Sequence, residues 1–91
     1  MKKIFGDDLY WKGKLLVFTW HFEEEFEKVN KPLDFVVEIL EHGEHHLVSK
    51  NENKYNVFYS FHRKYLCMSY VEHENVILIH IKPITSKPEE K

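Results

Sequence analysis

The chain has 91 residues, which suffices for one domain with a single modest hydrophobic core. Its 13 basic and 15 acidic side chains give a net charge of −2, and Arg63 is the sole arginine, so the sequence lacks the general basic excess typical of nucleic-acid-binding domains. A single cysteine excludes an intramolecular disulfide. No apolar run approaches the roughly 20 residues of a membrane helix and no signal peptide is recognisable, so we expect a cytoplasmic protein without membrane contact.

The N-terminal residues combine turn-forming and apolar side chains. Turn signals at Gly6-Asp7-Asp8 and Lys12-Gly13 flank the apolar segment Leu9-Tyr10-Trp11, which predicts a short hairpin arm or an irregular lead-in. Residues 14–20 are rich in branched and aromatic side chains and therefore predict a β-strand.

A first helix is predicted over residues 21–29. Phe22, Phe26 and Val29 recur at helical spacing, which gives the helix one apolar stripe for the core. The run Glu23-Glu24-Glu25 falls in the first turns, where carboxylates complement the helix dipole. We therefore expect a solvated acidic face there rather than a metal or catalytic site.

A second helix is predicted between Pro32 and Gly43. Proline suits the first helical position and glycine the position after the last turn. Leu33, Val36, Val37 and Leu40 recur between them at helical spacing, so this helix should pack across a sheet face.

The C-terminal half predicts a sheet. After a short strand at 47–50, the segments 55–62, 65–71 and 76–82 alternate apolar and polar residues and form a three-stranded antiparallel meander. The predicted fold is therefore α+β: residues 1–82 form one domain with an N-terminal strand, two helices and the meander, and the helices pack on one sheet face. Residues 83–91 contain two prolines and a charged end, so a disordered tail is predicted.

The alternation predicts a register for the meander. It places Val57, Tyr59 and Phe61 opposite Tyr70, Met68 and Leu66, and it places Ile77, Ile79 and Ile81 opposite the same three residues from the other side. A slip of one residue would move this apolar set to the opposite face, so the pattern specifies the core face well.

The same register predicts three rows on the opposite face. They are His62–Tyr65–Lys82, Ser60–Cys67–His80 and Phe58–Ser69–Leu78. Opposed side chains can touch, so the first row could hold a phosphate and move a proton, which makes its members candidate catalytic residues. The basic residues Arg63, Lys64, Lys50 and Lys54 are candidates for contacting nucleic acid. In the second row, Cys67 beside His80 suggests a thiol nucleophile activated by an imidazole, although a lone cysteine in a strand more often acts as a small hydrophobic residue.

The opposite face is also predicted to be apolar. Phe58, Leu78 and Val76 lie on it in this register, which is more apolar surface than a solvated face normally carries. The N-terminal arm, a second copy of the chain or a partner protein should therefore cover it.

Three histidines, His42, His45 and His46, cluster after the second helix. They could supply two zinc ligands, but no cysteine pair and no His-Glu-x-x-His motif accompanies them. We therefore expect neither a metal nor another cofactor.

The predicted elements follow the order strand, short helix, capped helix and meander, and Phe18-Thr19-Trp20 leads into the first helix. This order resembles that of the RelE/ParE toxin superfamily. The resemblance covers residues 14–82 and is nearest to BrnT-like members and neighbouring small domains of unknown function. Members of known activity cleave RNA with Lys, Arg, Tyr or His side chains on the sheet, and an antitoxin bound to the same domain neutralises them. By position, the resemblance implies such roles for His62, Arg63, Lys64, Tyr65 and Lys82.

Two functions follow as hypotheses. The first is a toxin-like domain that binds or cleaves RNA and has an antitoxin as its protein partner. The alternative is a non-catalytic interaction domain that docks a partner or forms a homodimer through its second sheet face.

Overall fold

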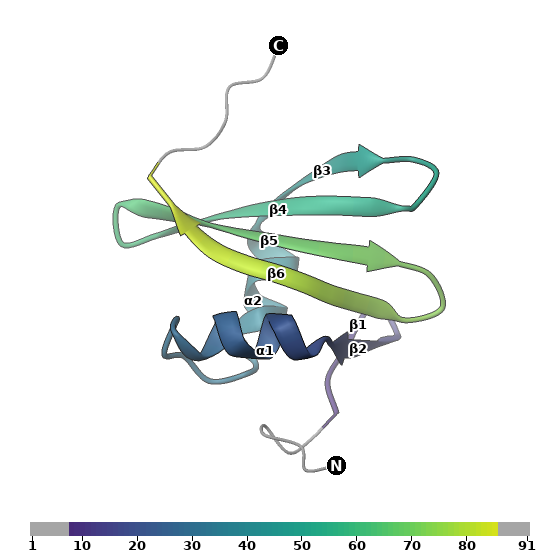
Figure 1. The fold of residues 1–91 in the computed structure, drawn as a ribbon, viewed down its shortest axis with the longest axis horizontal. Coiled ribbons are helices and arrows are strands. Elements are labelled where there is room, and N and C mark those ends of the chain that lie inside the picture. Colours follow the sequence, from purple (N-terminus) through teal and green to yellow (C-terminus); the bar gives the residue numbers. More distant parts are fainter. Residues whose placement is uncertain (1–7, 86–91) are drawn as a thin grey trace.

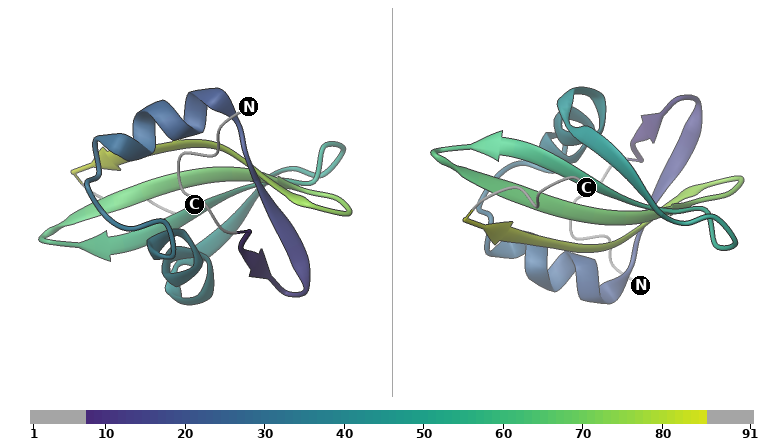
Figure 2. Two further views of the ribbon diagram at one scale, coloured as in Figure 1. Left: turned by 90° about the horizontal axis from the view of Figure 1, so that it is seen from below. Right: turned by 90° about the horizontal axis from the view of Figure 1, so that it is seen from above.

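A computed structural model describes residues 8–85 as one layer of helices on one sheet (Figure 1). In chain order the elements are β1 (Tyr10–Trp11), β2 (Lys14–Phe18), α1 (Trp20–Glu27), α2 (Phe35–His42), β3 (Glu44–Ser49), β4 (Lys54–Phe61), β5 (Lys64–Glu72) and β6 (Val76–Ile84). Both helices lie against the same sheet face, so the predicted α+β arrangement is confirmed (Figure 2). Neither helix has the length and apolar character needed to cross a membrane.

The sheet is mixed rather than purely antiparallel. Its strand order is β1-β2-β6-β5-β4-β3, and every neighbouring pair is antiparallel except β2 and β6. Leu16 lies beside Val76 and Phe18 beside Leu78 in that parallel pair. Parallel neighbours need a long crossover, and here the crossover contains both helices and β3 to β5. The predicted meander is therefore only the central part of the sheet.

The β4–β5 hairpin is tighter than predicted. Val57 pairs with Met68 and Tyr59 with Leu66, two positions away from the predicted register. The cause is a two-residue turn at His62 and Arg63, both with positive φ, as the type I′ turns favoured in hairpins require. A shift of two positions preserves the faces, so the predicted core face of this hairpin is confirmed.

A β-bulge in β6 overturns part of the predicted core. Tyr70 pairs with Leu78 whereas Ser69 pairs with His80, so Ile79 is the extra residue. One extra residue reverses the alternation beyond it. The predicted core positions of Ile77 and Ile79 are therefore wrong, and Val76 and Leu78, predicted on the opposite face, are fully buried in the core.

The core lies between the helices and the facing side of the sheet. The helices contribute Phe22, Phe26, Val36, Ile39 and Leu40, in agreement with the predicted stripes, and the strands contribute Leu16, Val57, Leu66, Met68, Tyr70, Val76, Leu78 and Ile81. The second helix begins later than predicted, because Pro32 belongs to a preceding turn in which its carbonyl accepts from the Phe35 N–H at 3.0 Å.

The ends of the described chain also differ from expectation. The hairpin reading of the N-terminal arm is confirmed for β1 and β2, which turn at Lys12 and Gly13, while Gly6 and Asp7 lie outside the described residues. The predicted tail begins too early, because β6 continues through Pro83 to Ile84. Residues 86–91 lie outside the described range.

Thr19 joins three elements, which makes it a test of this architecture. Its Oγ1 accepts from the Phe22 N–H at 3.1 Å as the N-cap of α1, and the same hydroxyl donates to the Leu78 carbonyl of β6 at 2.9 Å. We expect Thr19→Ala to lower the free energy of unfolding by about 1–2 kcal/mol, measured by urea denaturation. Thr19→Ser keeps the hydroxyl and should be much less destabilised. Equal destabilisation of the two variants would contradict this account.

Candidate functional site

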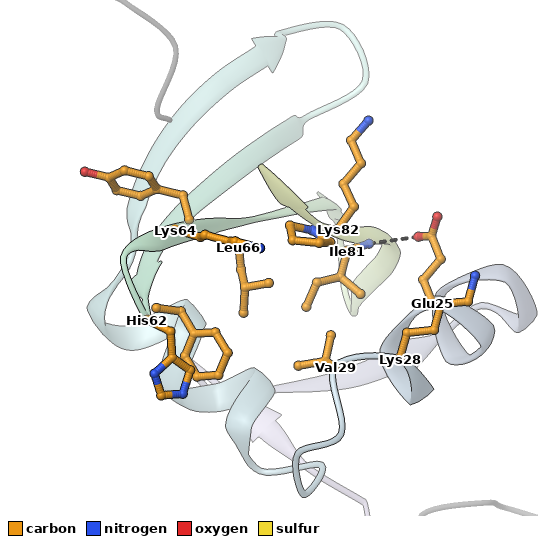
Figure 3. A pocket seen from close by; sticks show the side chains of 11 residues that line it. Glu25, Lys28, Val29, His62, Lys64, Leu66, Ile81 and Lys82 are labelled. Atoms are coloured by element: carbon orange, nitrogen blue, oxygen red, sulfur yellow. Dashed lines mark hydrogen bonds between the residues drawn. The ribbon is translucent and has the colours of Figure 1, made fainter. Parts of the chain in front are cut away.

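A cavity of about 650 Å³ lies between the second half of α1, the β4–β5 turn and the end of β6 (Figure 3). Its apolar part includes the buried side chains of Leu66 and Ile81, together with Val29, Phe61 and Pro83. In Figure 3, Val29, Leu66 and Ile81 converge on the middle of the cavity, with His62 and Glu25 on opposite sides of them. The cavity therefore has an apolar floor open to polar groups at its edges.

The polar rim brings together most of the residues singled out from the sequence. It consists of Glu25, Lys28, His62, Lys64, Tyr65 and Lys82. All three predicted catalytic residues are in this set, as is Lys64 from the predicted nucleic-acid contacts. Three lysines against one carboxylate make the rim a cationic environment near neutral pH.

The predicted row His62–Tyr65–Lys82 is nevertheless wrong as a geometry. Tyr65 pairs with Ser60 and Ile84, and Lys82 pairs with Cys67, because the tight turn and the bulge both shift the register. Side chains alternate along a strand, so Tyr65 and Lys82 point to the face opposite the buried Leu66 and Ile81. Figure 3 shows the Lys82 side chain extending away from those two residues. Leu66 and Ile81 thus line the cavity from the face that carries the helices, whereas Tyr65 and Lys82 border it from the opposite face.

The β4–β5 turn holds His62 at the rim in a strained backbone. His62 has φ 53° and Arg63 has φ 66°, a region in which residues other than glycine are uncommon. Asn-Gly is the usual sequence for such a turn. Here the turn carries His62, whose side chain lines the cavity, and Arg63, which is not among the lining residues.

Glu25 closes an open strand edge on the other side of the cavity. Its Oε1 accepts from the Ile81 N–H of β6 at 3.0 Å. β2 pairs with β6 only as far as Leu78, so within residues 8–85 this backbone donor has no strand partner on that side. The carboxylate is therefore fixed in position by the sheet itself.

The predicted Cys67–His80 pair does not form. Cys67 lies between Phe58 and Lys82, and His80 lies opposite Ser69. Burial raises the pKa of the Cys67 thiol, and the opposing influence of Lys82 is smaller. The arrangement therefore favours an unreactive thiol over a nucleophile.

The remaining predicted nucleic-acid contacts are dispersed. Arg63 is in the turn beside the cavity, whereas Lys54 begins β4 at the far end, about 23 Å away at roughly 3.3 Å per residue. Lys50 precedes β4 at that same far end. The two lysines therefore do not belong to the cavity.

The predicted partner-binding surface is reduced to Phe58. Val76 and Leu78 have 0% exposure and lie in the core, so they cannot form a surface. Phe58 remains on the face away from the helices, where it is 9% exposed and meets the His46 ring edge-on at 5.3 Å. Within residues 8–85, no helix covers this face (Figure 2).

The histidine cluster at 42–46 separates in the fold. His45 faces the helices, where its Nε2 donates to the Leu40 carbonyl at 2.7 Å and its Nδ1 lies 2.8 Å from the Tyr70 hydroxyl. Burial raises the pKa of Tyr70, so its hydroxyl remains a donor to this ring. His46 lies on the other side of β3 and pairs with Glu44 at 3.0 Å. The cluster is thus divided between part-buried hydrogen bonds of His45, a surface pair of His46 with Glu44, and an exposed His42 in the last turn of α2.

Glu25 and Lys28 are the rim residues that sequence reasoning missed. The acidic run predicts a solvated face for Glu25 and its neighbours, yet Glu25 follows Phe22 by three positions and precedes Val29 by four. Those spacings place its side chain beside the apolar stripe and so toward the sheet. The helical periodicity therefore carries a signal for Glu25, which lies between two stripe positions, whereas Glu24 has no stripe residue three or four positions away.

Comparisons of the chain with protein-family models, with curated proteins and with solved structures gave no match.

The strain in the β4–β5 turn yields a second prediction. Replacing its two central residues by the favoured pair, in the double variant His62→Asn with Arg63→Gly, should raise the free energy of unfolding by about 1 kcal/mol, because both residues then accept positive φ more readily. Thermal and urea unfolding would measure the change. A decrease in stability would show that the two side chains stabilise the turn through contacts that outweigh the strain.

Proposed function

We propose that this protein binds single-stranded RNA, with one nucleotide seated in the cavity between α1 and the β4–β5 turn. The observation that supports this most directly is the combination of an apolar floor containing an aromatic ring with a rim of three lysines and a histidine. The RelE/ParE-like order of elements gives independent support for RNA as the ligand.

The floor suits a nucleobase. At about 650 Å³, the cavity falls in the range of small-molecule sites, which is roughly 300–1,000 Å³. Phe61 supplies an aromatic ring that already contacts the Phe35 ring at 5.3 Å and the His62 ring at 4.3 Å. A base would add to this aromatic cluster by stacking, the interaction that tolerates any base in single-strand binding. The Lys31 ammonium lies 5.3 Å from the centre of that ring, which adds a further cation near the bound nucleotide.

The rim suits phosphate groups. Lys28 and Lys64 line the cavity from α1 and β5, and Lys82 of β6 lines its edge while its side chain extends toward the opposite sheet face. A bound strand would therefore meet the third cation where it leaves the cavity. Neutralising phosphates in this way releases counterions and makes binding salt-dependent. A local cationic rim can thus bind RNA although the whole chain has a net charge of −2.

Cleavage of the bound strand would use the groups at the two sides of the cavity. His62 and Glu25 line it from opposite sides, and an imidazole and a carboxylate are the usual pair for moving protons in such a reaction. The resemblance also predicts an antitoxin that binds this domain, and that partner stays a prediction. Docking through Phe58, Val76 and Leu78 lacks support, because two of these residues are fully buried.

A pair of double variants tests the binding site. Fluorescence anisotropy with a labelled oligoribonucleotide at low salt should show binding to the wild type. Lys64→Ala with Lys82→Ala should weaken it about tenfold or more and reduce the salt slope by about 0.7 for each phosphate that is no longer neutralised. Lys50→Ala with Lys54→Ala removes the same charge at the far end of β4 and should change the affinity less than twofold.

The two pairs separate a specific site from general attraction. Equal weakening in both would indicate binding by overall charge, and absence of binding by the wild type would overturn the proposal. For cleavage, His62→Ala should abolish product formation while retaining RNA binding. A DNA oligonucleotide of the same sequence, run in parallel, distinguishes recognition of RNA from recognition of any single strand.

A further inference from the structure

Three side chains with metal-ligating atoms meet at the edge of β6, beside the cavity. They are His21 and Glu25 of α1 and His80 of β6, and their ligand atoms all lie within 4.8 Å of one another. His21 Nε2 is 3.5 Å from Glu25 Oε2, and His80 Nδ1 is 3.5 Å from Glu25 Oε1. In residues 8–85 this is the one group of three such side chains.

Two of the three spacings are close to those of a tetrahedral zinc site, and the third, between the two histidine nitrogens, is within 4.8 Å. Ligand atoms about 2.0–2.1 Å from a tetrahedral Zn²⁺ ion are about 3.4 Å from each other. The two measured histidine–carboxylate distances of 3.5 Å nearly match this value, although they involve different oxygens of Glu25. Coordination by one oxygen requires a histidine ring to move, and the His21 and His80 rings lie edge to face with their centroids 4.7 Å apart. The His21 and His80 side chains are 51% and 46% exposed, which leaves both rings room to move.

The fold fixes each of the three positions. His21 and Glu25 are four residues apart on α1, so they share one side of the helix. Glu25 is oriented by the Ile81 N–H, and hydrogen bonds of this kind commonly hold ligating carboxylates. His80 directly follows the bulged residue Ile79, and bulges characteristically redirect the side chains next to them.

The ligand types indicate which metal the cluster fits. Two imidazole nitrogens and one carboxylate oxygen form a set that suits Zn²⁺ and also Fe²⁺, whereas Ca²⁺ and Mg²⁺ prefer oxygen ligands throughout. Three protein ligands leave one tetrahedral position for water or a substrate. The partial exposure of all three side chains gives an ion access from solvent.

We propose that His21, Glu25 and His80 form a Zn²⁺-binding site with one open coordination position. The site differs from the sequence-based expectation of no metal, and it uses none of the histidines at 42–46. The site is built from contacts of α1 with β6 and does not depend on RNA binding in the cavity. An ion held there would occupy the Glu25 carboxylate, so the metal site and proton transfer by Glu25 are alternative uses of this side chain.

Zinc titration of untagged protein in the absence of nucleic acid tests the site. Isothermal calorimetry should show one Zn²⁺ ion bound per chain. Changes to residues that merely support a ligand typically weaken metal binding about 10–100-fold, so removing a ligand should cost at least roughly tenfold. His80→Gln and Glu25→Gln are the variants of choice. Glutamine at position 25 retains an oxygen acceptor for the Ile81 N–H, so the strand edge stays closed.

His46→Gln is the matched control, because His46 also lies beside a carboxylate, at 3.0 Å from Glu44. It should bind Zn²⁺ within about twofold of the wild type, because β3 lies three strands away from β6 in the sheet and His46 is neither a proposed ligand nor a residue that supports one. Replacing Zn²⁺ by Co²⁺ should give the intense visible absorption of a tetrahedral site, and His80→Gln should remove it. Wild-type affinity in both ligand variants, or an equal weakening in His46→Gln, would overturn the proposal.

Discussion

The unpaired edge of β6 is the constraint on which the rest of this structure depends. β2 pairs with β6 only from Val76 to Leu78, so beyond that point the part of the chain that the structure describes provides no neighbouring strand on one side of β6. Buried backbone donors must still be satisfied. Glu25 accepts from the Ile81 N–H, and Pro83, two residues further along the same edge, has no N–H to satisfy. This combination protects the edge from pairing with another chain.

The hydrogen bond between Glu25 and the Ile81 N–H also determines the position of the neighbouring candidate sites. Holding Glu25 against β6 draws α1 along the strand edge, which forms one wall of the cavity and brings His21 next to His80. Glu25 thus belongs to the strand edge, to the cavity and to the histidine cluster at once. A side chain that the fold requires for backbone satisfaction is therefore also the one that links both proposed sites.

Local patterns predicted the parts of the fold that depend on short-range physics. The stripe of Phe22 and Phe26 and the alternation of β4 and β5 identified which faces are buried, because a helix or a hairpin must bury its apolar side whatever its partner. They also placed His62, Tyr65 and Lys82 at one end of the sheet, where all three line the cavity. The predicted contacts among them failed, because a two-residue turn and a bulge each shift the pairing.

The sequence by itself determined the helices, the central hairpins and the apolar face of β4 and β5, since these follow from periodicity within a few residues. Only the tertiary structure decided the bulge at Ile79, because Val76, Ile77, Leu78 and Ile79 are all apolar and alternation cannot choose between them. That choice depends on β2 binding alongside β6 in parallel, a contact between residues about sixty positions apart. It buried Val76 and Leu78 and set His80 beside Glu25, and so it decided where the candidate sites lie.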